Sequence, residues 1–196
     1  MPWKNDQVSE LETTKIIEMA RECLSVYGDY VEFGCYKGDT SLMLADVLRN
    51  GIKECAKKLW IYDSFEGLPE KRAEDYSEVG KDFEAGVLTV SKREVKERFL
   101  RAGLPVPVIK KGWFADLKNM DLPQRIAFAF LDGDFYESIK DSLRLVGNRM
   151  EVGGIIMIHD YNNPALPGVT KAVDEWMGDK NYKFDRFESL AVIRII

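Results

Sequence analysis

The stretch AFAFLDGDFYES, residues 127–138, joins five apolar residues directly to two carboxylates, Asp132 and Asp134. An uninterrupted apolar run of this length is typical of a strand covered on both faces, as in a parallel sheet flanked by helices. The carboxyl ends of such strands form the edge at which open α/β sheets bind ligands. The stretch therefore predicts an α/β fold with Asp132 and Asp134 at its binding edge. The alternative for either aspartate alone is a loop or helix-capping role.

Strands and helices are predicted to alternate along the rest of the chain. Strands are expected at residues 29–34, 58–63, 106–110, 125–132 and 153–160, with helices at 7–27, about 40–51, 91–103, after 134 and at 168–178. Residues 182–187 and 189–195 have almost no room between them, so they predict an antiparallel hairpin. This order predicts a doubly wound, mostly parallel seven-stranded sheet with a C-terminal antiparallel hairpin.

Local signals support two of these helices. The apolar residues Val8, Leu11, Ile16, Ala20 and Leu24 recur near helical spacing in the first helix. A Ser91/Glu94 capping box opens the helix at 91–103. Both patterns indicate amphipathic helices that lie on the sheet.

The composition is that of one ordinary globular domain spanning residues 1–196, with 45% hydrophobic and 31% charged residues. The net charge is −5 and the chain has no long basic run, so nucleic acid is not an expected partner. No apolar stretch is long enough to cross a membrane, and the start, MPWKNDQVSE, lacks the apolar core of a signal peptide. Cys23, Cys35 and Cys55 are odd in number and irregularly spaced, which predicts reduced thiols and a cytoplasmic protein.

Residues 64–90 are polar and irregular, with acids and bases mixed. An irregular segment of this length inside a compact domain is more often a functional lid than a plain connector. We therefore expect this segment to close over a binding site.

The first two strands end in residues suited to a nucleoside ligand. Gly34 and Gly38 allow a sharp turn and a close backbone approach before a helix N-terminus. Asp63 ends the second strand, where an acid can accept hydrogen bonds from both ribose hydroxyls. The alternatives are a structural turn at the glycines and a turn-capping role for Asp63.

The fourth and fifth strands end in Asp132-Gly133-Asp134 and His159-Asp160. If these strands are neighbours, their ends meet at one edge and bring carboxylate and imidazole groups together. Such ligands suit Mg²⁺, Mn²⁺ or a similar ion. The alternative for His159, the single histidine of the chain, is a hydrogen-bonded core residue.

Five ordered motifs carry a resemblance that covers roughly residues 28–178: VEFGCYKGDTS (31–41), IYDSFEGLPE (61–70), KGWF (111–114), FLDGDFYES (130–138) and GGIIMIHDY (153–161). Together they resemble the macrocin and mycinamicin sugar O-methyltransferase family. The resemblance implies a Rossmann-like class I methyltransferase fold, S-adenosylmethionine (SAM) as cofactor and dependence on a divalent metal such as Mg²⁺.

The resemblance also implies site residues. The SAM-binding residues would be Glu32, Phe33, Gly34, Cys35, Tyr36, Gly38, Thr40, Ser41, Asp63, Ser64, Phe65, Gly112, Trp113, Phe114 and Asp132. The metal ligands would be Asp132, His159 and Asp160, and the catalytic groups Asp132, Asp134 and His159. The sequence departs from the family pattern in two places: His159-Asp160 stands where the family has two aspartates, and the N-terminal segment is shorter.

The predicted function is metal-assisted methyl transfer from SAM to a hydroxyl of a small molecule, such as a sugar or natural-product glycoside. A carboxylate, Asp132 or Asp134, would take the hydroxyl proton. The alternatives are a metal-dependent glycosyl- or phosphoryl-transfer enzyme that uses the Asp-x-Asp motif, and a non-catalytic SAM-binding protein. The glycine spacing disfavours a nicotinamide-dependent dehydrogenase. The sequence leaves open whether the protein forms a homo-oligomer.

Overall fold

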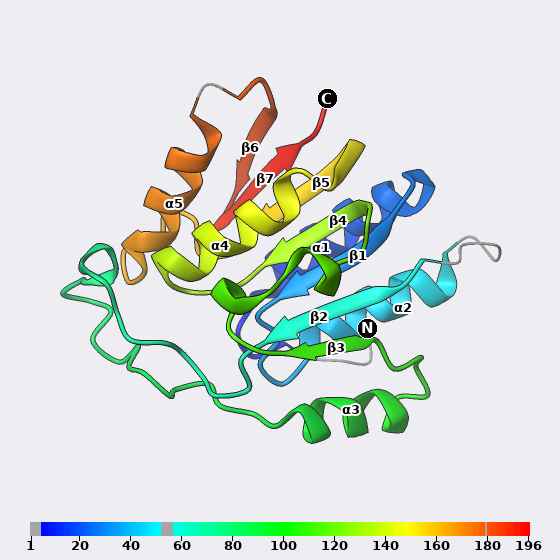
Figure 1. Ribbon diagram of the computed structural model, residues 1–196, viewed down its shortest axis with the longest axis horizontal. Helices are drawn as coiled ribbons and strands as arrows, with labels where there is room; N and C mark the ends of the chain where they lie inside the picture. The colour runs from blue at the N-terminus through cyan, green and yellow to red at the C-terminus, as the bar shows by residue number, and fades with distance from the viewer. Residues whose placement is uncertain (1–4, 52–56, 179) are drawn as a thin grey trace.

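A computed structural model describes residues 5–51, 57–178 and 180–196. Its seven strands form one sheet in the order β3-β2-β1-β4-β5-β7-β6 (Figure 1). The strands are β1 Asp29–Phe33, β2 Leu59–Asp63, β3 Val108–Lys111, β4 Ile126–Leu131, β5 Met150–Ile158, β6 Lys183–Phe187 and β7 Leu190–Arg194. The first five are parallel to one another, and β7 pairs antiparallel with both β5 and β6. The predicted doubly wound sheet with its antiparallel hairpin is confirmed.

Helices cover both faces of the sheet. They are α1 Glu10–Glu22, α2 Asp39–Asn50, α3 Lys92–Arg101, α4 Tyr136–Gly147 and α5 Pro167–Met177. Buried residues of α1, α2 and α3 pack in one core cluster, and those of α4 and α5 pack in the other. Every residue of β4 is fully buried between the two clusters, which is why its sequence is an unbroken apolar run.

The first helix is shorter than predicted, because Ser9 caps it at its N-terminus and a 3₁₀ turn at Cys23–Ser25 follows it. Leu11 belongs to the apolar pattern of the sequence but does not face the core, since the residue is 63% exposed. The buried stripe of α1 runs through Thr13, Ile16 and Ala20. Leu11 precedes this stripe and points to another side of the helix, since successive residues turn by about 100°.

The fifth strand begins earlier than predicted, at Met150. The register between β4 and β5 shifts between Ile126 and Phe128, and Gly153 takes a positive φ of 82° on the β5 side. Such an irregularity bends a strand locally. Because β5 ends at Ile158, His159 and Asp160 follow it directly and lie at the carboxyl edge of the sheet.

The segment 64–90 contains no helix or strand beyond the 3₁₀ turn Ala73–Asp75 (Figure 1). The middle of the segment is attached to the helices α4 and α5. The buried carboxylate of Asp75 accepts a hydrogen bond from the backbone N of Tyr136 at 2.7 Å, and Glu74 forms an ion pair with Lys171 at 3.1 Å. Any closing movement of this segment therefore has a fixed point at Asp75.

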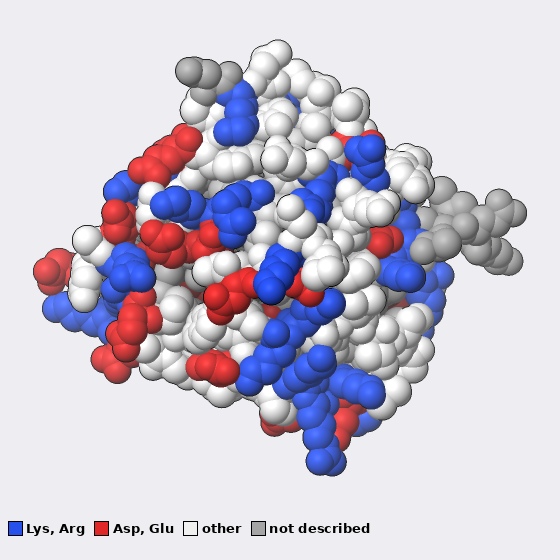
Figure 2. Space-filling view, in the orientation of Figure 1, with Lys and Arg blue, Asp and Glu red and all other residues white. Residues whose placement is uncertain are grey.

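Figure 2 shows acidic and basic side chains interspersed over much of one face, with basic ones gathered near α3. Among the described residues, none of the helices has the length and hydropathy needed to span a bilayer. Cys23 and Cys35 are buried free thiols, as predicted, and burial raises the pKa of Cys23 to about 12. Cys55 lies outside the described residues.

Candidate active site

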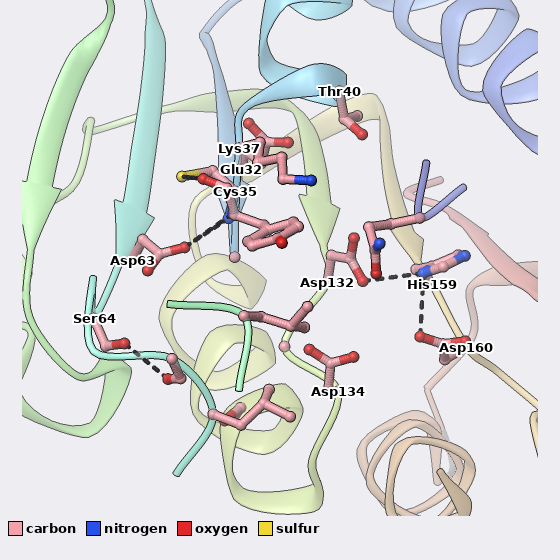
Figure 3. A pocket seen from close by; sticks show the side chains of 18 of the residues that line it. Glu32, Cys35, Lys37, Thr40, Asp63, Ser64, Asp132, Asp134, His159 and Asp160 are labelled. Atoms are coloured by element: carbon pink, nitrogen blue, oxygen red, sulfur yellow. Dashed lines mark hydrogen bonds and ion pairs between the residues drawn. The ribbon is translucent and has the colours of Figure 1, made fainter. Parts of the chain in front are cut away.

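A cavity of about 260 Å³ opens at the carboxyl ends of β1, β2, β4 and β5 (Figure 3). Most of the predicted site residues line it: Glu32, Gly34, Cys35, Tyr36, Thr40, Asp63, Ser64, Trp113, Phe114, Asp132, Asp134, His159 and Asp160. This edge is where open α/β sheets bind ligands. The structure therefore brings the predicted SAM-binding residues and the predicted metal ligands into one cavity.

The other predicted residues support the cavity without lining it: Phe33, Gly38, Ser41, Phe65 and Gly112. Phe33 stacks on Tyr62 inside the core with ring centroids 4.5 Å apart. Gly38 is the N-cap of α2 with a φ of 82°, and the amide of Gly112 donates to the backbone oxygen of Asp63 at 3.0 Å.

The turn after β1 depends on Gly34. This residue has a φ of +83°, and a Cβ placed on it would lie 1.9 Å from the backbone oxygen of Asp132. No larger residue fits between the ends of β1 and β4 without moving one of them. Gly34 therefore allows the loop after β1 to lie directly against the acidic end of β4.

Asp63 fixes the same loop from the other side. One carboxylate oxygen accepts hydrogen bonds from the backbone N of Cys35 at 2.8 Å and of Tyr36 at 3.3 Å. The other accepts from the backbone N of Phe65 at 2.7 Å. A carboxylate offers about four lone-pair directions, so Asp63 retains acceptor capacity for a ligand hydroxyl. The turn-capping alternative is thus compatible with a hydrogen bond from one ribose hydroxyl, whereas the predicted bonds from both hydroxyls would have to share the remaining acceptor direction.

Glu32 is a buried carboxyl group at the floor of the cavity, and the hydroxyl of Ser41 donates a hydrogen bond to it. Burial raises the pKa of Glu32 to about 8, and the charge of Asp132 adds to the effect. The group is therefore mostly protonated at neutral pH. A positively charged ligand in the cavity would favour its ionised form.

Asp132, His159 and Asp160 form the predicted polar cluster (Figure 3). Nδ1 of His159 lies 3.0 Å from a carboxylate oxygen of Asp132 and 3.2 Å from one of Asp160. One ligand atom from each residue lies within 4.8 Å of the others. This spread suits a single small cation, because bonds of about 2.0–2.6 Å place neighbouring ligand atoms roughly 3–5 Å apart.

Asp134 lies outside this group and faces the cavity (Figure 3). It takes a positive φ of 60°, which turns its side chain away from the line of β4. Burial, with the neighbouring charges of Asp132 and Asp160, raises the pKa of Asp134 well above its usual range. Such a carboxyl group is a stronger base when ionised than an exposed aspartate.

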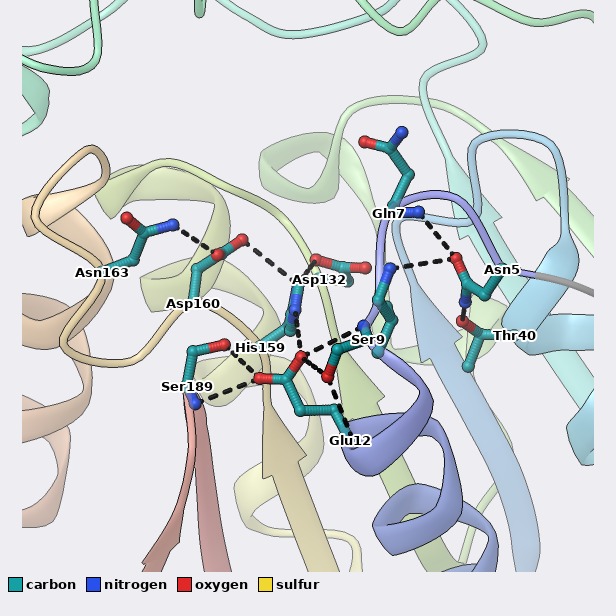
Figure 4. Close-up of polar contacts among 11 residues, drawn as sticks. Asn5, Gln7, Ser9, Glu12, Thr40, Asp132, His159, Asp160, Asn163 and Ser189 are labelled. Atoms are coloured by element: carbon teal, nitrogen blue, oxygen red, sulfur yellow. Dashed lines mark hydrogen bonds and ion pairs between the residues drawn. The ribbon is translucent and has the colours of Figure 1, made fainter.

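The N-terminal segment supplies site residues that sequence reasoning missed. Asn5, Gln7 and Val8 line the cavity, and the side-chain amide of Asn5 donates to the hydroxyl of Thr40 at 2.9 Å. Glu12 lies behind the cavity, with one carboxylate oxygen 3.9 Å from Nε2 of His159 (Figure 4). The only sequence signal for Glu12 was the Ser9/Glu12 capping pattern, which indicates a helix start and no site.

His159 is thus surrounded by carboxylates. Burial by itself lowers the pKa of His159, but Asp132, Asp160 and Glu12 outweigh it and raise that pKa well above the usual range. The contact with His159, followed by hydrogen bonds from Ser189 and Ser9, lowers the pKa of Glu12 despite its burial. The hydrogen-bonded alternative for His159 agrees with its contact to Asp132.

Comparison with known proteins identifies the family. The family model described as macrocin-O-methyltransferase (TylF) matches residues 11–188. The chain belongs to the macrocin O-methyltransferase family. The family resemblance carried by the five sequence motifs is confirmed.

Two relatives are named for the reactions that they catalyse. The 8-demethyl-8-(2,3-dimethoxy-alpha-L-rhamnosyl)-tetracenomycin-C 4'-O-methyltransferase of Streptomyces olivaceus is 35% identical over 158 residues, 78% of this chain and 59% of that protein. The demethyldecarbamoylnovobiocin O-methyltransferase of Streptomyces niveus is 29% identical over 191 residues, 91% of this chain and 70% of that protein. This chain thus spans about three fifths of the length of the Streptomyces olivaceus relative.

Solved structures confirm the class I methyltransferase fold. The structure of the O-methyltransferase NovP superposes with a TM-score of 0.81 at 26% identity, covering 94% of this chain and 80% of that chain. The calicheamicin methyltransferase CalS11 has the same fold, with a TM-score of 0.77 at 20% identity, covering 93% of this chain and 78% of that chain.

Proposed function

We propose that this protein transfers a methyl group from SAM to a hydroxyl of a sugar or glycosylated natural product, with the help of a divalent cation. One observation carries the proposal. In a chain of this family, the glycine loop after β1 and the acidic cluster after β4 and β5 open into the same cavity. A cofactor held by the loop would then meet an acceptor hydroxyl held near the cluster. Family membership favours this reaction over glycosyl or phosphoryl transfer.

The cavity suits a cationic cofactor. Its lining includes the acidic residues Asp63, Asp132 and Asp160, and the carboxyl groups of Glu32 and Asp134 can ionise beside a bound cation. The one lysine among the described lining residues, Lys37, forms an ion pair with Asp6 at 2.9 Å. SAM carries a sulfonium and an ammonium group, and a negative cavity concentrates such charges. Asp63 would accept hydrogen bonds from the ribose, and Trp113 and Phe114 would contact the adenine.

The donor set of Asp132, His159 and Asp160 fits a divalent cation, since hard oxygen ligands and one imidazole suit Mg²⁺, Mn²⁺ or Zn²⁺. A cation bound there would lower the pKa of an acceptor hydroxyl and orient it. We assign the hydroxyl proton to Asp134, which lines the cavity, because Asp132 contacts His159 and would be engaged at the cation. As the new carbon–oxygen bond forms, the sulfur–methyl bond breaks and its electron pair stays on sulfur.

Exclusion of water would fall to the segment 64–90 and to the N-terminal residues. Gly67, Leu68, Phe83 and Leu88 of that segment line the cavity. Gln7, on the segment before α1, also lines it. Closure around an acceptor would align the reacting groups and keep water from the site.

The acceptor class follows from the family. The relatives act, by their names, on a rhamnosylated tetracenomycin, on demethyldecarbamoylnovobiocin and, for the Micromonospora griseorubida protein, on mycinamicin III. These three compounds form the first acceptor panel. Formation of S-adenosylhomocysteine and of methylated product would be measured with and without EDTA.

Asp132→Asn should abolish transfer while SAM affinity stays within a few-fold, because its role lies at the cation and the acceptor. Asp141→Asn is the matched control, since Asp141 pairs with Arg144 on the surface of α4. Undiminished turnover in EDTA would exclude cation assistance. Binding of S-adenosylhomocysteine without turnover on a broad glycoside panel would favour the non-catalytic SAM-binding alternative.

A further inference from the structure

We infer that Glu12 is a positioning residue, which holds the ring of His159 so that Nε2–H points to helix α1 and Nδ1 points to a cation between Asp132 and Asp160. The inference rests on the proposed cation assistance and extends it to a residue outside the ligand group.

The carboxylate of Glu12 is fixed on both oxygens (Figure 4). Oε2 accepts from the backbone N of Ser9 at 3.2 Å and from its hydroxyl at 2.7 Å. Oε1 accepts from the backbone N of Ser189 at 3.1 Å and also from its hydroxyl. Glu12 is only 6% exposed, and four donors from two distant parts of the chain define its position. Oε2 is also the atom that lies 3.9 Å from Nε2 of His159.

The opposite ring nitrogen of His159 faces the cavity. Nδ1 lies 3.0 Å from Asp132 and 3.2 Å from Asp160, and the residue is only 7% exposed. A neutral imidazole has one N–H donor and one acceptor nitrogen, whereas an ionised carboxylate only accepts. Asp132 and Asp160 can likewise accept from Nδ1, but once these two carboxylates bind a cation, Glu12 is the carboxylate that still accepts beside the ring, and it favours the tautomer with hydrogen on Nε2. The lone pair of Nδ1 is then left for a cation held by Asp132 and Asp160.

This arrangement has a known physical consequence in metalloproteins. A carboxylate that accepts from the second nitrogen of a ligating histidine fixes the tautomer and the ring orientation, and it increases the basicity of the ligand. Loss of such a partner commonly lowers metal affinity by about 10- to 100-fold. Glu12 differs from a plain helix cap because the oxygen that accepts from Ser9 also lies 3.9 Å from Nε2 of His159, which is an ion-pair distance that a small movement of the ring would shorten to a hydrogen bond.

The test compares Glu12→Gln with Glu22→Gln. Glu22 lies on the same helix and also joins α1 to the hairpin, but its ion pair is with Arg194 at 2.6 Å, whereas Glu12 pairs with His159. Binding of Mn²⁺, Zn²⁺ and Mg²⁺ to the full chain would be measured by calorimetry without SAM or acceptor. We expect Glu12→Gln to weaken cation binding at least tenfold, and Glu22→Gln to leave it within twofold.

A second readout reports the ring directly. His159 is the single histidine, so a long-range ¹H–¹⁵N spectrum of the untagged protein contains one imidazole. With Zn²⁺ bound, the wild-type spectrum should show Nε2–H with Nδ1 bound to the metal, and Glu12→Gln should show a mixture of tautomers. Glu12→Asp, which keeps the charge one methylene further away, should give an intermediate cation affinity and covers the case in which Glu12→Gln does not fold.

The outcomes separate the inference from the proposed function. If wild type and Glu12→Gln bind the cation within twofold of each other, with the same tautomer, the inference is overturned and cation assistance stands. If the wild type binds none of the three cations, cation assistance and the inference are both overturned. SAM-dependent methyl transfer is tested separately, by the formation of methylated product. A tenfold loss confined to the Glu12 variants supports the positioning role.

Discussion

Replacing Gly34 with alanine tests whether the site depends on the close approach of β1 and β4. Two effects add at this position. A non-glycine residue in a left-handed conformation costs roughly 1–2 kcal/mol. The added methyl group would lie 1.9 Å from the backbone oxygen of Asp132, and relieving such an overlap in a packed region costs roughly 1–3 kcal/mol more. The expected loss of unfolding free energy is therefore about 2–5 kcal/mol.

The chain offers two matched controls for the backbone effect alone. Gly86 has a φ of +82° and Gly103 a φ of +64°, and a Cβ on either one meets nothing within 4 Å. Alanine at these positions should cost only about 1–2 kcal/mol. Gly103 follows the packed helix α3, so the backbone strain in Gly103→Ala should lower the measured free energy of global unfolding.

The measurement is urea unfolding followed by circular dichroism, with thermal melts in parallel. For a chain of this size, 1 kcal/mol corresponds to about 2–4 °C, so Gly34→Ala should lower the melting temperature by roughly 4–20 °C. It should also reduce methyl transfer in the protein that stays folded, because relief of the overlap moves Asp132. Equal losses of stability for Gly34→Ala, Gly86→Ala and Gly103→Ala would show that the contact with Asp132 is unimportant.

Three further predictions concern titration, cofactor binding and the segment 64–90. Because burial raises the folded-state pKa of Glu32 to about 8 from about 4.5, the folded chain holds an extra proton between these values. The unfolding free energy should then fall as pH rises from 5 to 8, by at most about 1.4 kcal/mol per pH unit, and Glu32→Gln should flatten that slope in urea melts. S-adenosylhomocysteine should raise the melting temperature of the wild type, and Asp63→Ala should shrink that rise; a clear shift with NAD alone would contradict cofactor assignment to SAM. Trypsin should cut within residues 64–90 faster in the free protein than in the S-adenosylhomocysteine complex. Asp75→Ala should increase the rate of cleavage, because it removes the hydrogen bond to Tyr136. Equal cleavage rates with and without S-adenosylhomocysteine would mean that the segment is no lid.

Much of the architecture was determined by the sequence alone. The apolar run of β4 is a local pattern, and burial on both faces requires such a run wherever a central parallel strand occurs. Because parallel strands end at a common edge, Asp63, Asp132 and His159 could be placed at one site once the order of strands and helices was known. The glycines at 34 and 38 were likewise identified as turn residues, since their conformational freedom belongs to the residue itself.

Tertiary structure alone decided which distant residues complete that site. Glu12 and Ser189 are 177 positions apart, and no periodicity relates them, yet they meet beside His159 because α1 and the terminal hairpin pack near the end of β5. Asp75 caps α4 from another part of the chain in the same way. Why Gly34 tolerates no side chain also became visible only in three dimensions, because the obstacle is a backbone oxygen of another strand. Local sequence patterns reflect the conformation and burial of a residue within its own segment, whereas contacts between segments depend on how whole elements pack.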